Sequence, residues 1–282
     1  MSLPAGASRV RAAFAHADAG GRCALVVYLM AGYPDEATSL AAAEAALSSG
    51  ADLLEIGVPF SDPVADGPVI AAAGHAAVAT GGGVESALRL VAALREAGHE
   101  QPILAMGYLN FIVARGSARA LSDLSSAGVD ALIVPDLPAG EDPQLERLAA
   151  HAGLGICFLV TPNTSAARME RAIRASSAFL YVVPLFGVTG VRERVADNTG
   201  PLLRRIRSMV DGRVPIAVGF GVSQPGHVRE LALADGVIVG SAVVAALGDG
   251  GPRRVGSLVA SLAAATGPAA GRRSGRPSDR RR

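Results

Sequence analysis

Short apolar runs recur along the chain, and each is followed by a longer segment that mixes apolar and polar residues. The runs show no alternation of apolar and polar positions, which is typical of strands buried on both faces of a parallel sheet. A glycine often ends the segment that precedes a run, as it does at the end of a helix. We predict eight strands at these runs, over residues 23–30, 53–56, 103–106, 131–134, 156–160, 180–183, 215–218 and 236–239.

The mixed segments predict helices over residues 36–49, 84–97, 117–127, 143–152, 166–175, 201–210 and 225–232, and a last helical region that runs to about residue 265. A short leading helix is predicted over residues 8–17. Eight strand–helix units without a break in composition favour one α/β domain, a (β/α)8 TIM barrel over residues 1–266. A doubly wound open sheet is the alternative, disfavoured because no Gly-x-Gly-x-x-Gly motif follows the first strand.

Two stretches fall outside this repeat. The loop after the second strand contains Pro59, Pro63 and Pro68, which makes it too rich in proline for a helix or a central strand. Residues 267–282 are rich in glycine, serine, proline and arginine, and we predict that they form a disordered basic tail.

Composition limits the partners and the compartment. Half of the residues are hydrophobic, so a sizeable core is expected, and the net charge of +1 gives no general case for nucleic acid or a membrane surface. Cys23 and Cys157 lie in apolar runs with no metal ligand nearby, which favours buried thiols in a reducing compartment. The chain begins without a signal-peptide layout, and no apolar run reaches the roughly 18 residues of a membrane span. We therefore expect a soluble, cytoplasmic protein.

Glu55 is the most unusual residue of the predicted strands. A buried carboxylate is costly unless it is paired, and no cation stands close to it in the sequence, so a chemical role is favoured. A carboxylate satisfied by backbone donors is the structural alternative. Asp66 follows in the proline-rich loop, where Asp-Gly before proline is also ordinary turn chemistry. Further polar residues follow other strands, at the carboxyl ends where barrel sites lie: Tyr108, Asp136, Thr161 and Tyr181.

Glycine-rich loops follow the last three predicted strands, at residues 187–190, 219–221 and 240–241. Backbone amides can approach an anion at such loops, and a helix N-terminus adds a favourable dipole, so a phosphate site is predicted. Simple turns are the alternative. The five histidines show no metal-ligand spacing, and the chain has no lysine, which excludes imine chemistry on a lysine side chain.

Residues 54–68 resemble, almost letter for letter, the most specific motif of the tryptophan synthase alpha chain family. Further motifs of that family match at residues 31–34, 106–108, 134–138, 187–190, 218–223 and 240–241, so the resemblance covers about residues 29–244. Members cleave indole-3-glycerol phosphate to indole and glyceraldehyde 3-phosphate. The indole then passes through a tunnel to a β subunit, whose pyridoxal phosphate joins it to serine.

The resemblance implies a lyase of tryptophan biosynthesis that uses no metal or cofactor of its own. Its substrate would be indole-3-glycerol phosphate and its partner a β subunit, in an alpha–beta heterotetramer. By position, Glu55 would protonate C3 of the indole and can also take the glycerol hydroxyl proton. Asp66 would hold the indole N–H and stabilise positive charge on the ring. Other substrate contacts are implied for Tyr108, Tyr181, Thr189 and Phe220.

The same comparison assigns phosphate contacts to Ser241 and to the amides around Gly190, Gly221 and Gly240. Thr189 would lie on a mobile loop that closes the site and orients Asp66. Asp62 and its neighbouring prolines would face the β subunit.

Some positions depart from the family pattern, and they bear on loop closure and on coupling to a partner. Met30 stands where the family usually has threonine, Phe111 replaces a common proline, and Pro184, Leu185 and Phe186 replace a more polar segment. Two alternatives therefore stay open beside the alpha subunit. One is a stand-alone lyase that releases free indole, and the other is a non-catalytic alpha-like activator of a β subunit.

Overall fold

The computed structural model describes residues 3–184, 199–219, 221–231 and 233–267. Within these residues, nine parallel strands form one sheet in the order β5-β4-β3-β2-β1-β9-β8-β7-β6. The first and last strands of this order, β5 and β6, are neighbours in the chain and are separated by Phe158 alone, so the two ends of the sheet meet. The strands are β1 (Ala24–Met30), β2 (Leu53–Gly57), β3 (Ile103–Met106), β4 (Ala131–Ile133), β5 (Gly155–Cys157), β6 (Leu159–Val160), β7 (Leu180–Val182), β8 (Ile216–Gly219) and β9 (Gly236–Val239).

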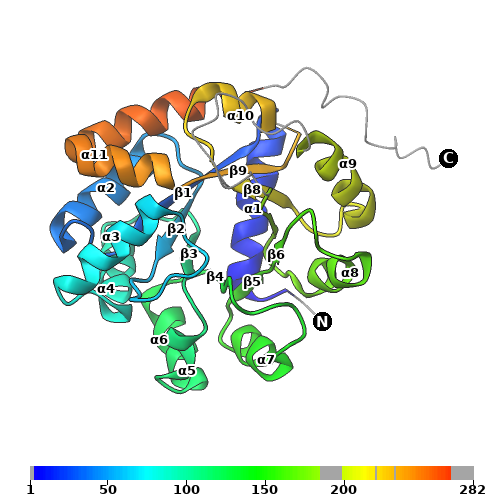
Figure 1. The fold of residues 1–282 in the computed structure, drawn as a ribbon, viewed down its shortest axis with the longest axis horizontal. Helices are drawn as coiled ribbons and strands as arrows, with labels where there is room; N and C mark the ends of the chain where they lie inside the picture. The colour runs from blue at the N-terminus through cyan, green and yellow to red at the C-terminus, as the bar shows by residue number, and fades with distance from the viewer. Residues whose placement is uncertain (1–2, 185–198, 220, 232, 268–282) are drawn as a thin grey trace.

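Helices surround the strands, as Figure 1 shows, and the predicted TIM barrel is confirmed. They are α1 (Ala5–Ala19), α2 (Glu36–Ser48), α3 (Pro68–Ala79), α4 (Val84–Glu96), α5 (Asn110–Val113), α6 (Ser117–Ala127), α7 (Pro143–His151), α8 (Ala166–Ala175), α9 (Thr199–Val210), α10 (Pro225–Leu231) and α11 (Ser241–Ala264). Several begin at a side chain that accepts a hydrogen bond from the first turn. Asp35 caps α2, Asp142 caps α7 and Ser165 caps α8.

The barrel interior is closed at its amino-terminal end by α1. Val10, Phe14 and Ala17 of this helix pack with inward-facing strand residues such as Val26 and Leu104 in one buried cluster. The helix lies close to the strands, since a Cβ on Gly6 would lie 2.0 Å from the carbonyl oxygen of Asp130. The interior of the barrel is therefore filled by packed side chains beneath the site that the sequence predicts at the other end.

The structure corrects two details of the predicted elements. The proline-rich loop ends sooner than expected, because Pro68 begins α3, at a position where a helix needs no amide donor. The predicted fifth strand, residues 156–160, divides at Phe158 into β5 and β6, each of which pairs with a different neighbour. The last helical region is confirmed as α11, with a break at Gly250 and Gly251. The predicted tail lies beyond Gly267, outside the described residues.

Across the described ranges, no single helix is long and apolar enough to cross a membrane. The pair α3 and α4 passes that test together by length and composition, and the two helices are bent by 97° at the break between them.

Replacement of Phe14 by alanine tests the role of α1. Phe14 is 4% exposed and its ring lies 5.4 Å from that of Phe179. We expect the change to lower the free energy of unfolding by about 3–5 kcal/mol, because it leaves a cavity beneath the barrel. Urea denaturation measures it, with Leu233→Ala at an exposed apolar position as control. A loss below about 1 kcal/mol for Phe14→Ala would show that α1 is not part of the core.

Candidate active site

Glu55 lies in β2 with its side chain in the same inward series as Leu53 of the barrel interior. The residue is 1% exposed, and its Oε2 atom has no hydrogen-bond partner among the described residues. Burial, and then the nearby charge of Asp66, raises the pKa of Glu55 to about 8. Glu55 therefore holds a proton at neutral pH and presents it inside the barrel.

Two tyrosines stand beside this carboxyl group. Tyr28 of β1 is the register partner of Glu55, and the pKa of both Tyr28 and Tyr181 is raised well above its usual value by burial and by Glu55. Glycine makes room for each ring. A Cβ on Gly57 would lie 2.1 Å from the hydroxyl of Tyr28, and one on Gly219 would lie 2.5 Å from that of Tyr181. Both phenols stay neutral beside the carboxyl group.

Tyr28 was missed by the sequence reasoning, although Tyr181 was singled out. The sequence did offer one sign of it, because the tyrosine hydroxyl is a polar group inside the first apolar run. Only the strand register reveals that this residue faces Glu55.

Asp66 lies in the loop between β2 and α3 and is half-buried. Burial raises its pKa to about 6, and a hydrogen bond with the Tyr108 hydroxyl opposes that rise. The same hydroxyl accepts a hydrogen bond from the amide of Ala65 at 2.8 Å, and the Tyr108 ring packs on Phe60 with centroids 5.3 Å apart. The structure thus brings Asp66, Tyr108 and Glu55 together, and at pH 7 one carboxyl group is protonated while the other is mostly ionised.

The described part of the predicted phosphate site surrounds the same end of the barrel. Gly240 and Ser241 follow β9 and start the long helix α11, and Gly221 follows β8 with a positive φ of 72°. Three other predicted residues, Thr189, Gly190 and Phe220, lie outside the described residues. Asp136, after β4, accepts from the amide of Leu109, after β3, at 2.8 Å and so joins the loop next to Tyr108. The contact of Thr161 is local, since its amide donates to Thr164 at 2.9 Å.

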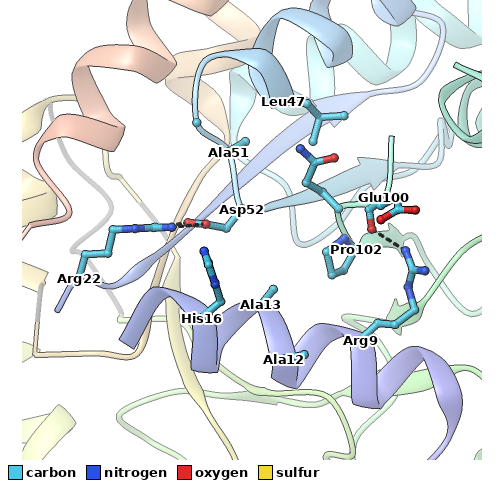
Figure 2. A pocket seen from close by; sticks show the side chains of 12 residues that line it. Arg9, Ala12, Ala13, His16, Arg22, Leu47, Ala51, Asp52, Glu100 and Pro102 are labelled. Carbon is cyan, nitrogen blue, oxygen red and sulfur yellow. Dashed lines mark hydrogen bonds and ion pairs between the residues drawn. The ribbon is translucent and has the colours of Figure 1, made fainter. Parts of the chain in front are cut away.

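A hollow of about 560 Å³ lies at the opposite end of the barrel, between α1 and the segments before β1, β2 and β3 (Figure 2). Three charged residues of its lining, Arg9, Arg22 and Asp52, already have partners. Arg22 binds Asp52 through two hydrogen bonds of 2.6 and 2.7 Å, and Arg9 pairs with Asp130 at 2.8 Å. Its size alone therefore does not make it the reaction site, since Glu55 and Asp66 lie at the other end of the barrel.

Comparisons with known proteins identify the family of the chain. Residues 14–266 match the family model described as tryptophan synthase alpha chain. The chain belongs to the tryptophan synthase alpha chain family. It is similar to the tryptophan synthase alpha chain of Gluconacetobacter diazotrophicus, with 45% identity over 86% of this chain and 88% of the relative. It is also similar to that of Chloroflexus aggregans, with 41% identity over 84% and 88%.

Solved structures give the same result. A structure of Mycobacterium tuberculosis tryptophan synthase superposes with a TM-score of 0.85 and 38% identity, over 92% of this chain and 98% of that chain. The resemblance found in residues 54–68 is thereby confirmed at the level of the family, whose members are lyases of tryptophan biosynthesis. The roles of individual site residues stay predictions.

The raised pKa of Glu55 has a consequence for stability. The folded protein keeps a proton up to about pH 8, whereas the unfolded chain releases it near the ordinary value of 4.5. The free energy of unfolding should therefore fall between these pH values, by at most about 1.4 kcal/mol per pH unit. Glu55→Gln removes this loss, so the variant should gain stability over the native chain as pH rises from 5 to 8.

Urea denaturation at pH 5 and pH 8 measures the difference. Glu96→Gln, at an exposed position at the end of α4, is the matched control and should track the native chain. If the Glu55→Gln and native curves stay parallel over this range, Glu55 is ionised in the folded protein and the assigned pKa is wrong.

Proposed function

We propose that Glu55 and Asp66 perform the cleavage of indole-3-glycerol phosphate that the family catalyses. The observation that carries the proposal is the buried Glu55 carboxyl group, which has an oxygen without a partner among the described residues and a pKa near 8. An acid that must deliver a proton at neutral pH needs such a pKa. A turn residue or a carboxylate held by backbone donors would show neither property.

The reaction balances with these two groups. Glu55 gives its proton to C3 of the indole, and the positive charge that develops on the ring is stabilised by the ionised Asp66 at the indole N–H. Glu55, now ionised, takes the proton of the glycerol hydroxyl group next to the ring. The carbon–carbon bond then breaks, its electron pair returns to the indole, and the hydroxyl carbon becomes the aldehyde of glyceraldehyde 3-phosphate.

Gly221, Gly240 and Ser241 would hold the phosphate of the substrate. Gly240 and Ser241 stand at the N-terminus of α11, where free amides and the helix dipole favour an anion. Tyr28, Tyr108 and Tyr181 would form the walls around the indole. Burial and both carboxyl groups raise the pKa of Tyr28 and of Tyr181, and Tyr108 is hydrogen-bonded to Asp66. Thr189, Gly190 and Phe220 keep the substrate and phosphate roles that the motif implies.

A β subunit of tryptophan synthase is the proposed partner, in an alpha–beta heterotetramer. The partner would bind at the loop between β2 and α3, where Val64 is 86% exposed and Asp62 is also exposed. Val113, in the segment after β3, is a further exposed apolar side chain at 55%. Contact with a β subunit at this loop would remove the Val64 side chain from water.

Charge removal at each carboxyl group tests the mechanism. Glu55→Gln and Asp66→Asn should each lower the rate of indole formation by about 10²–10⁴-fold, because the amides can neither donate the proton nor oppose the ring charge. Asp62→Asn, an exposed carboxylate of the same loop, is the control in the chain assayed without partner. Retention of more than about a tenth of the activity by either site variant would refute its assigned role.

The phosphate site is tested at Gly221. We expect Gly221→Val to raise KM for indole-3-glycerol phosphate at least about tenfold, since the side chain blocks approach to the amide. Gly212→Val is the control, because Gly212 has the same φ of 72° with open space around it. Inorganic phosphate should compete with substrate, and EDTA should change nothing because every step is assigned to protein groups. Equal KM values for the two variants would remove Gly221 from the site.

The partner surface is tested at Val64. Val64→Asp should weaken binding of a β subunit and reduce the stimulation of kcat by that subunit, while kcat of the chain alone stays unchanged. Leu233→Asp, at an exposed apolar position away from this loop, should leave both unchanged. Full stimulation of Val64→Asp would place the partner elsewhere, and no stimulation of the native chain would favour the stand-alone lyase.

A further inference from the structure

The end of β1 packs against α3. Met30, the last residue of β1, is 3% exposed, and a Cβ on Gly74 would lie 3.3 Å from its terminal methyl carbon. Gly74 lies in the middle of α3, where glycine weakens a helix relative to alanine. Helix propensity therefore does not explain a glycine at position 74. The missing side chain leaves a notch in α3, and the end of the Met30 side chain fills this notch.

The position of α3 determines the position of Asp66. The helix begins at Pro68, directly after its N-cap Gly67, so Asp66 is separated from the first helical residue by one position. His75, the neighbour of Gly74, bonds through Nε2 to the carbonyl oxygen of Ser61 at 2.8 Å. A shift of α3 would therefore move both ends of the loop that carries Asp66.

Met30 also contacts Tyr28, the residue that pairs in register with Glu55. The Tyr28 hydroxyl donates to Sδ of Met30 at 3.9 Å, and these two residues form a buried cluster with Ala73, Ala77 and Val244. The cluster reaches the proposed phosphate loop, because Tyr28 and Ile70 of α3 each lie 3.4 Å from the Cβ position of Gly240. One small cluster thus joins the residue beside Glu55, the helix after Asp66 and the start of α11.

We propose that Met30 is a positioning residue of the active site. Its terminal methyl group fills the notch at Gly74, holds α3 in place and thereby fixes the position of Asp66 relative to Glu55. The inference rests on the proposed function of these two carboxyl groups. It also gives a physical reason for methionine at this position. Threonine is too short to fill the notch, and it would leave the Tyr28 hydroxyl without the sulfur.

A double-mutant cycle in the full chain tests the proposal. Met30→Thr should empty the notch and Gly74→Ala should crowd the methionine, and we expect each to lower kcat about three- to tenfold with KM changed less than about twofold. In the double variant the alanine methyl occupies the space that methionine leaves, so kcat should recover to within about threefold of the native value. Ala76→Gly, an exposed change in the same helix, is the control for helix stability and should not lower kcat.

The pH profile separates positioning from mere packing. A loosened α3 exposes Asp66 more to water, so the acid limb of kcat/KM, near pH 6 in the native chain, should move to lower pH in Met30→Thr. The proposal would be overturned if the kcat of the double variant fell by the product of the two single losses. It would also be overturned if Met30→Thr had a lower kcat but an unchanged acid limb in its kcat/KM profile. If instead Glu55→Gln and Asp66→Asn stay active, the proposed function itself fails, so the two failures are distinguishable.

Discussion

The Glu55 carboxyl group lies inside the barrel, away from water, with one oxygen that no described group hydrogen-bonds. The cost of placing a negative charge there is what keeps the proton on at neutral pH. The surroundings agree with this constraint, because Tyr28 and Tyr181, whose pKa values burial and Glu55 raise, are neutral phenols and not cations. An arginine in either position would have ionised the group and removed the acid.

Asp66 differs from Glu55 because its environment differs. It is only half-buried, and the Tyr108 hydroxyl bonds to it, so its pKa stays near 6. With these two pKa values, one group is a proton donor and the other an anion at the same end of the barrel, so two like charges are avoided at neutral pH. The barrel supplies the rigid frame: β2 carries Glu55, and the packing of α3 against β1 holds the loop of Asp66.

Much of the architecture could be predicted from the sequence, since unalternating apolar runs are typical of a parallel sheet and their number fits a barrel. Glu55 stood out because a carboxylate in such a run needs an explanation. Helix α3 was missed because Pro68 was interpreted as part of a loop, although proline is favoured in the first turn of a helix. The contact of Met30 with Gly74 could not be found either, because it depends on how β1 and α3 pack and not on either segment alone.

Infrared difference spectroscopy shows directly whether Glu55 is a neutral acid in the folded protein. The carbonyl stretch of a protonated carboxylic acid is followed from pH 5 to pH 10 in the native chain, with Glu55→Gln as the reference. We expect a band that is absent from the variant and that disappears in the native chain with a midpoint near pH 8. A Glu55 carboxyl group that is already ionised at pH 6 would contradict it.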